Sequence, residues 1–239
     1  MAYQFFILWL LWAYCAFANV EKVIFLTPAA EPLPQDASID NLFLTRLSEQ
    51  YPSVRTRINA SFPSTVSPKG TESWFLLEHL RPGRRYELRI CWLATQPTSF
   101  WLYSHTVDHT FETPALLTSL SAYASARHAQ LGSEDSQSLL LRKAKARPSD
   151  IESTLLFLQV FAAADYFSLN QTLMKIVPPV AVDVILDPYV FNILPKSLAP
   201  TGLYLVVIAT GAWFLSGWIS RLLARPVVQQ VQLRADKTD

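Results

Sequence analysis

Two pairs of residues have the types and the spacing that could support chemistry. His105 and His109 flank Asp108 in a segment expected to be a strand, and imidazole is a common metal ligand. Four residues along a strand put both rings on one face but about 13 Å apart, too far to share one metal. Asp183 and Asp187 could act as general acid and base only if substrate pockets surround them. We therefore expect ordinary strand histidines, no metal site and no catalytic residue.

Motifs of the common enzyme classes are missing from the sequence. It has no GxSxG elbow, no glycine-rich phosphate loop, no CxxC pair and no HExxH zinc motif. Of the two cysteines, Cys15 lies in the apolar N-terminal segment and Cys91 beyond it, which leaves the mature chain one thiol and no internal disulfide. These observations predict an accessory or recognition protein that needs no cofactor.

The balance of charges disfavours nucleic acid as a partner. The 239 residues include 20 Lys and Arg against 19 Asp and Glu, which gives a formal net charge of +1. Such a balance creates no extended positive field for a polyanion. Roughly 180 residues remain between the two apolar ends of the chain, enough for one domain of ordinary size with appended segments.

A long uncharged run near the C-terminus predicts a membrane anchor. It covers twenty-two residues, and a helix of that length crosses a hydrocarbon core of about 30 Å. We place a single transmembrane helix at residues 198–220. Arg221 and Arg225 follow the run whereas only Lys196 precedes it closely, and cytosolic flanks hold the excess of positive charge. The tail, residues 221–239, is therefore expected in the cytosol.

The N-terminal end predicts a secretory signal. Residues 5–12 (FFILWLLW) form an apolar core too short to span a bilayer, and residues 16–18 (AFA) have the small-x-small pattern of a signal-peptidase site. We assign residues 1–18 to a signal peptide, which puts the body of the chain in the lumen. Because no Lys or Arg precedes the apolar core, an uncleaved anchor is the alternative, and the middle of the chain is translocated in either case.

Two sequons agree with a lumenal body. Asn59-Ala60-Ser61 and Asn170-Gln171-Thr172 fit the Asn-X-Ser/Thr pattern, which is modified on the lumenal side of the membrane. We therefore expect glycans at Asn59 and Asn170.

Between residues 19 and 113 the pattern is typical of a β-sandwich. Short stretches rich in β-branched and aromatic residues alternate with Pro, Ser, Asp and Gly, and this many strands in under a hundred residues favour two packed sheets. We predict a mostly β lumenal domain over residues 19–113, an immunoglobulin- or fibronectin-III-like sandwich. The expected strands cover residues 21–27, 39–47, 54–62, 71–80, 84–93 and 99–111.

A tyrosine near the start of one strand supports this fold. In residues 84–93, Tyr86 and Trp92 belong to the apolar set that faces the core, alternating with mostly charged side chains. Tyr86 follows Leu80 by six residues across a Pro-Gly turn, as in the tyrosine corner of immunoglobulin-like sandwiches. Once buried, its hydroxyl needs a partner such as an upstream backbone group. A plain turn followed by any buried tyrosine is the alternative.

The segments that follow are expected to lie between the sandwich and the membrane. A Thr-Pro start predicts a helix from residue 114 to about residue 131, and a polar linker completes residues 114–150. The basic residues of this linker are either solvated or in contact with lipid headgroups. Residues 151–197 hold two apolar segments, expected at the membrane surface or against a partner. A membrane hairpin containing Asp183 and Asp187 is the rival topology.

The predicted span carries small residues along one side. Their spacings of seven, three, four and four keep them on one face of a helix, and small residues let helix backbones approach closely in lipid. We expect this face to pack against a helix of a membrane partner. The stripe consists of Gly202, Ala209, Ala212, Ser216 and Ser220.

Four stretches of the chain carry a resemblance to a known family. They are residues 19–26 (NVEKVIFL), 70–77 (GTESWFLL), 83–92 (GRRYELRICW) and 95–102 (TQPTSFWL). In these stretches the chain resembles the fungal GPI-mannosyltransferase II co-activators, and the resemblance covers most of the lumenal segment and the anchor. It implies a non-catalytic partner of the polytopic mannosyltransferase that adds the second mannose to the GPI precursor in the endoplasmic reticulum membrane.

A different class of protein shares the same layout. A single-pass receptor of the secretory pathway or the cell surface, with a β-sandwich that binds a protein or a glycan, is the alternative function. Residence separates the two, since an accessory subunit stays in the endoplasmic reticulum and a receptor matures through the Golgi.

Overall fold

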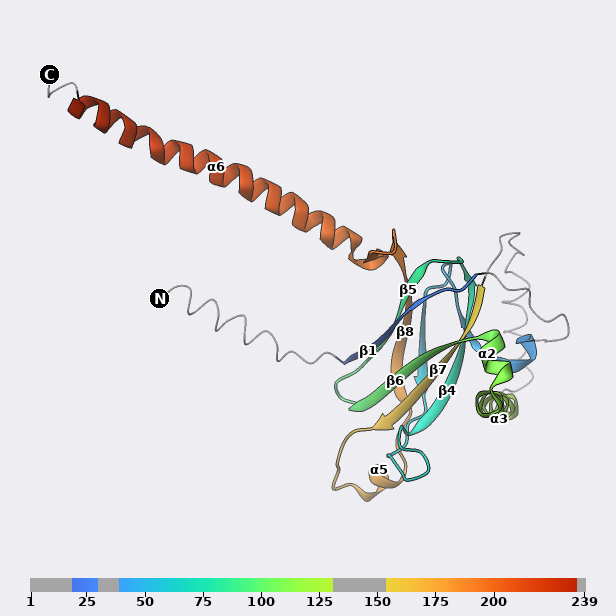
Figure 1. Ribbon diagram of the computed structural model, residues 1–239. Helices are drawn as coiled ribbons and strands as arrows, with labels where there is room; N and C mark the ends of the chain where they lie inside the picture. The colour runs from blue at the N-terminus through green and yellow to red at the C-terminus, as the bar shows by residue number, and fades with distance from the viewer. Residues whose placement is uncertain (1–18, 30–38, 131–153, 236–239) are drawn as a thin grey trace. The chain divides into compact units, whose positions relative to one another are not determined.

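The computed structural model of the chain describes residues 19–29, 39–130 and 154–235 (Figure 1). Its contacts divide the chain into two compact units, Met1–Tyr189 (unit 1) and Val190–Asp239 (unit 2), which are described separately. The expected signal peptide, residues 1–18, and the expected polar linker before residue 150 lie outside the described residues.

One sheet of unit 1 joins strands that are far apart in the sequence. Its order is β1-β5-β8-β3, and each neighbouring pair is antiparallel. Val23, Leu88 and Leu186 stand side by side across three of these strands and face the core. The strands are β1 (Val20–Leu26), β3 (Ser53–Ile58), β5 (Arg85–Trp92) and β8 (Val180–Val190).

The second sheet has the order β2-β4-β7-β6, with β2 parallel to β4 and the other pairs antiparallel. Its β7 strand is almost wholly apolar because both of its faces are covered, as in sheets packed on two sides. Leu158 faces the first sheet, while Phe157 belongs to a second apolar cluster on the other side. The strands are β2 (Thr45–Leu47), β4 (Thr71–Leu80), β6 (Thr98–Thr106) and β7 (Thr154–Ala164).

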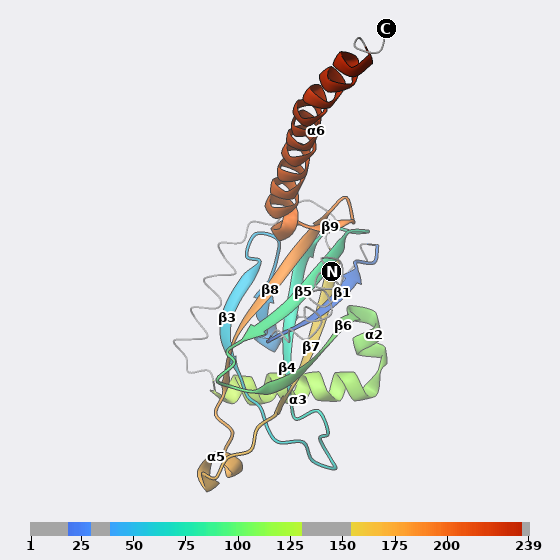
Figure 2. The same cartoon turned by 90° about the vertical axis from the view of Figure 1, so that its left-hand side faces the viewer.

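The two sheets pack face to face around one core. Tyr86 and Val184 from the first sheet and Leu158 from the second are fully buried in a single cluster, and Figure 2 shows the first sheet in front of the second. The prediction of a mostly β fold is confirmed. The immunoglobulin or fibronectin type III arrangement is not, because an immunoglobulin constant domain joins its first, second, fifth and fourth strands in one sheet. In this chain one sheet joins the first, fifth, eighth and third.

Helices form a third layer on the outer face of the second sheet. Figure 1 shows them on the side of β4 and β7 that faces away from β5 and β8. Leu120 and Val107 from these helices pack with Trp74 and Phe157 from the sheet, and Trp74 Nε1 donates to Ser119 Oγ at 3.3 Å. The elements are the 3₁₀ helix η2 (Ile39–Leu42), α2 (Val107–Glu112) and α3 (Pro114–Gln130).

Three predicted strands are shorter than expected. Over residues 99–111, β6 ends at Thr106, whose Oγ1 accepts a hydrogen bond from the backbone N–H of His109 at 3.2 Å and so caps α2. Residues 39–47 divide into η2 and β2, and the strand expected to reach residue 62 ends at Ile58. The predictions for β4 and for α3 match the observed elements within one residue at each end.

The largest correction concerns the two apolar segments expected near the membrane within residues 151–197. They form β7 and β8, the inner strands of the two sheets: β7 lies between β4 and β6, and β8 lies between β5 and β3. Their apolar character serves the core of unit 1, where Leu158 and Val184 are fully buried. The boundary expected at residue 113 and the membrane hairpin are therefore both wrong, because the sandwich extends to β8.

Gly70 occupies a position that no residue with a side chain fits. Its φ is +76°, and a Cβ built there would lie 2.1 Å from the carbonyl oxygen of Ala162. Glycine therefore lets the turn before β4 approach the backbone of β7.

Unit 2 consists mainly of one long helix. The short β9 (Leu194–Pro195) and η3 (Lys196–Leu198) precede α6 (Ala199–Ala235). Within the described part of the chain, Lys196–Leu222 is the one helical segment long and apolar enough to cross a membrane. Large apolar side chains such as Trp213, at 80 % exposure, are open to the surroundings, as expected of a span that faces lipid.

Candidate functional site

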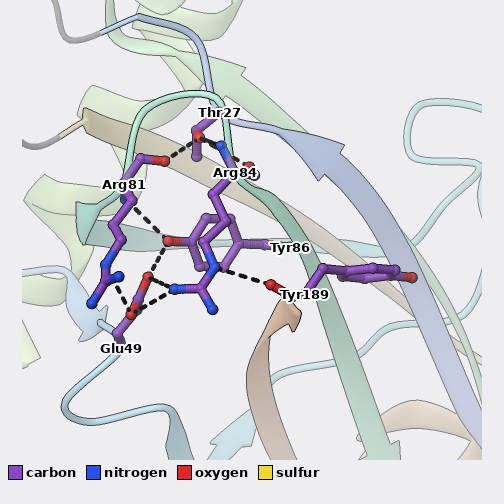
Figure 3. A network of polar contacts seen from close by, with 6 residues as sticks. All are labelled: Thr27, Glu49, Arg81, Arg84, Tyr86 and Tyr189. Atoms are coloured by element: carbon purple, nitrogen blue, oxygen red, sulfur yellow. Dashed lines mark hydrogen bonds and ion pairs between the residues drawn. The ribbon is translucent and has the colours of Figure 1, made fainter. Parts of the chain in front are cut away.

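One end of unit 1 is held together by a polar network around Tyr86 (Figure 3). The Tyr86 ring is fully buried and stacks on Phe25 at a centroid distance of 5.9 Å. Its hydroxyl accepts a hydrogen bond from the backbone N–H of Arg81 at 3.0 Å and donates one to the carboxylate of Glu49. We call this network the tyrosine clamp; its members are Thr27, Glu49, Arg81, Arg84, Tyr86 and Tyr189.

The negative charge of the tyrosine clamp lies on Glu49, which forms ion pairs with two arginines. Its carboxylate lies 3.0 Å from Arg84 Nη1 and 3.5 Å from Arg81 Nε. Burial raises the pKa of Tyr86 well above its usual value, and the hydrogen bond to Glu49 raises this pKa further. The hydroxyl therefore stays protonated at physiological pH and remains a donor to Glu49.

Arg84 and Thr27 extend the clamp to β8 and to the end of β1. The backbone N–H of Arg84 donates to Thr27 Oγ1 at 3.1 Å, and Arg84 Nε donates to the carbonyl oxygen of Tyr189 at 3.1 Å. Tyr189 is the last residue of unit 1. The clamp therefore fixes the point at which the chain leaves the sandwich. Sequence reasoning identified Tyr86 but missed Glu49, because that residue comes from a distant connection with no motif of its own.

The other two residues expected to be structural, Leu80 and Trp92, are the last residues of β4 and β5. Leu80 is fully buried at the end of β4, just after an irregularity in the pairing of β4 with β7 and after His79, which has a φ of +56°. Trp92 is half-buried at the margin of the core, with its ring 4.7 Å from that of Phe100. Trp92 is thus less buried than its place in the alternation predicts.

Both sequon asparagines are exposed. Asn59 lies directly after β3. Asn170 caps the short helix α5 (Gln171–Lys175), because its Oδ1 accepts a hydrogen bond from the backbone N–H of Thr172 at 3.0 Å. A glycan on either residue would leave the core undisturbed, so both remain proposed glycosylation sites.

A groove of about 930 Å³ runs between α3 and the strands β3 and β4. Small residues of α3 form much of its wall, together with the charged side chains of Arg57, Glu72 and Arg127. Two of these charges serve the fold: Glu72 accepts a hydrogen bond from Gln159 Nε2 at 2.5 Å, and Arg127 Nε donates to the carbonyl oxygen of Phe43 at 2.6 Å. The groove therefore has the size of a ligand site without a set of polar groups converging on a ligand.

The small-residue stripe lies on α6 as the spacing predicts. Its members from Ala209 to Ser220 are exposed, and Gly202 is partly covered by Leu194. The Ser220 hydroxyl donates to the carbonyl oxygen of Ser216, which satisfies a polar group that lipid could not. The stripe thus offers a face for close packing of another helix.

The amino-acid sequence matches the model of one protein family. Residues 9–125 match the model of the GPI-mannosyltransferase II co-activators. The chain is similar to this family over those residues, which make up just under half of its length. Comparisons with curated proteins and with solved structures give no match.

This similarity supports a role in GPI-anchor biosynthesis and, with it, a place in the membrane of the endoplasmic reticulum. The matched residues include every strand from β1 to β6, with α2 and most of α3. The strands β7 and β8 lie beyond the match, although they complete both sheets.

The two histidines are closer together than predicted. The separation of about 13 Å expected for a strand is wrong, because α2 begins after Thr106 and brings the rings of His105 and His109 to a centroid distance of 5.8 Å. His105 Nε2 lies 2.9 Å from Gln159 Oε1, a partner within the fold. Among the described residues, no group of three or more potential metal ligands is found.

Asp183 and Asp187 form separate ion pairs on β8. Asp183 receives two hydrogen bonds from Arg55, at 2.7 and 2.8 Å, and this contact holds the pKa of the Asp183 carboxyl below its usual value. Asp187 is buried, and its carboxylate lies 3.7 Å from the guanidinium of Arg89. The two carboxylates therefore contact different arginines, and Arg89 also lies 3.6 Å from the carboxylate of Glu87.

Proposed function

We propose that the chain is a non-catalytic accessory subunit of GPI-mannosyltransferase II, which stabilises or activates the polytopic catalytic subunit that adds the second mannose. The family match over residues 9–125 carries this assignment. The described residues support it, since their acidic and histidine pairs serve hydrogen bonds and ion pairs within the fold. A receptor function gains no support from the comparisons.

The accessory subunit is proposed to cross the endoplasmic reticulum membrane once, with a lumenal body and a cytosolic tail. The helix Lys196–Leu222 contains the span, and Arg221 and Arg225 at its C-terminal end supply the cytosolic excess of positive charge. Its partners are then the catalytic subunit and the surrounding membrane lipid.

Glycosylation tests this topology. Endoglycosidase should increase the mobility of the wild-type chain on a gel, because the sequons face the lumen. The double variant Asn59→Gln, Asn170→Gln should migrate as the deglycosylated protein does. Protease added to sealed microsomes should remove an epitope placed after Asp239. Protection of that epitope would show that the tail is lumenal.

The stripe on α6 is proposed to bind a helix of the catalytic subunit. Ala212→Leu with Ser216→Leu should keep the span inserted while it lowers recovery of the catalytic subunit from detergent and slows addition of the second mannose. Bulky side chains separate the two backbones and so remove the close packing that holds helices together in lipid. Affinity purification, with a mass-spectrometric identification of the catalytic subunit, measures the first effect, and GPI precursor analysis measures the second.

The matched control changes the opposite side of the same helix. Val207 and Phe214 lie about half a turn from the stripe at 100° per residue. Val207→Leu with Phe214→Leu should leave recovery unchanged. If the stripe variant recovers its partner and supports GPI assembly as well as wild type, the lumenal unit carries the association instead.

A further inference from the structure

Three large apolar side chains at one end of unit 1 are unusually exposed. Phe167, Leu169 and Ile176 are 82 %, 91 % and 70 % exposed, and all three lie in the connection between β7 and β8. We call them the apolar tip. In the rest of described unit 1, large apolar side chains reach at most the 64 % of Tyr51, apart from Val66 at 90 %. Val66 belongs to the connection between β3 and β4, which lies at the same end of the sandwich as α5 in both views (Figures 1 and 2).

The connection that carries the apolar tip has a defined conformation. Asn170 caps α5, and the Tyr166 hydroxyl donates to the carbonyl oxygen of Leu173 at 3.1 Å. The Tyr166 ring also packs edge-on against Phe62 of the neighbouring connection, at a centroid distance of 5.2 Å. Because these contacts hold the connection in place, little conformational freedom remains to be lost when the tip binds.

The composition of the connection favours a protein as the occupant. Between Asp165 and Lys175 it contains no Lys, Arg, Asp or Glu, but it contains Tyr, Phe and Met. Cores of protein interfaces are depleted of charge and enriched in aromatic residues and Met. Segments that settle on lipid carry clusters of Lys and Arg beside their apolar residues, and one lysine borders this tip.

The position of the tip along β8 also favours a protein over lipid as the occupant. The connection enters β8 at Val180, and the chain leaves unit 1 at the other end of the strand. At about 3.3 Å per residue, the eleven residues of β8 separate these two ends by about 36 Å. The end that continues into the anchor is therefore not the end that carries the apolar tip.

We propose that the apolar tip docks into an apolar hollow on the lumenal side of the catalytic subunit. This interface rests on the proposed accessory function and adds to it a contact outside the membrane. It also separates the two sequons, because a glycan on Asn170 would stand next to Leu169 and screen the tip, whereas Asn59 follows another strand. The proposed interface therefore requires that chains bound to the catalytic subunit lack the glycan proposed for Asn170, while Asn59 can carry one.

The test uses the full chain in microsomes that contain the catalytic subunit. Phe167→Ser with Leu169→Ser should lower recovery of the catalytic subunit from detergent roughly tenfold or more, since a few apolar anchors dominate an interface. A photo-crosslinking amino acid at position 167 should form an adduct with the catalytic subunit. Ile24→Ser with Leu26→Ser is the matched control, because these residues of β1 are also exposed and apolar, at 48 % and 61 %.

Three results would overturn the docking interface: undiminished recovery with the tip variant, adducts with lipid alone, or full glycosylation of Asn170 in the purified complex. Protease resistance of the tip variant should equal that of wild type, because the exchanged side chains lie outside the core. If the wild-type chain itself recovers no catalytic subunit, the accessory function fails together with its interface. If wild type and tip variant recover it equally, the interface alone fails.

Discussion

Replacing Tyr86 by alanine should lower the free energy of unfolding of unit 1 by about 3 to 5 kcal/mol. The substitution removes a fully buried ring from the shared core and leaves the Arg81 N–H and the Glu49 carboxylate without their common partner. A loss of this size is a large part of the stability of an ordinary domain. Limited proteolysis of the full chain across a urea series measures the effect.

Two further variants divide this loss into its parts. Tyr86→Phe keeps the ring and removes only the hydroxyl, so it should cost about 1 to 3 kcal/mol, the usual penalty of leaving buried polar partners unsatisfied. Arg57→Ala removes an exposed side chain on β3 and should stay within about 0.5 kcal/mol of wild type. Equal resistance of the Tyr86→Ala and Arg57→Ala variants would show that the clamp does not hold the sandwich.

Replacing Val184 by aspartate should prevent unit 1 from folding. Val184 is fully buried in the core between the sheets, and an ionised carboxylate placed there has no partner to offset its lost hydration. The cost should exceed about 4 kcal/mol, at the extreme of single substitutions. Expression level and protease resistance of the full chain in microsomes report the outcome.

The adjacent residue on β8 provides the control. Asp183 points away from the core and pairs with Arg55 at the surface, so Asp183→Asn should leave expression and protease resistance close to those of wild type. This contrast between neighbours is specific to a strand with one buried face. If Val184→Asp were tolerated as well as Asp183→Asn, β8 would not be an inner strand of the sandwich.

Strands with a clean alternation and a turn before them were predictable from the sequence. β5 alternates between core and outer side chains and follows a Pro-Gly turn, so its limits and the burial of Tyr86 could be inferred. The helix α3 was predictable for a similar reason, because a proline opens it at Pro114. Local chemistry decides such elements, and local chemistry is visible in a single sequence.

The inner strands were missed because their surroundings come from distant parts of the chain. β7 shows no alternation, since the first sheet covers one of its faces and α2 and α3 cover the other. β8 does alternate, with Val180, Val182 and Val184 inward, but nearby prolines and aspartates suggested an interrupted membrane segment. The alternating valines were the signal that could have identified it.

The tyrosine clamp was predictable only in part. A buried tyrosine hydroxyl requires a partner, and the turn before β5 placed the backbone of Arg81 within reach. Nothing in the local sequence could place Glu49 beside the same hydroxyl, since that contact depends on how β2 and β3 are connected. The predicted distance between His105 and His109 was wrong for a local reason. Thr106 caps α2, so the chain between the two rings is helical where a strand was expected.

The position of β7 and β8 in the middle of the two sheets has a consequence for the timing of synthesis. A ribosome delivers β1 to β6 first, yet β4 cannot connect to β6, nor β5 to β3, until residues 154–190 have followed. The proposed anchor helix begins only nine residues after β8 ends, so in the proposed topology the last core strand enters the lumen just before the chain is halted in the membrane. Unit 1 therefore completes its folding when the polypeptide is already tethered, and until then four strands keep unpaired edges that invite aggregation.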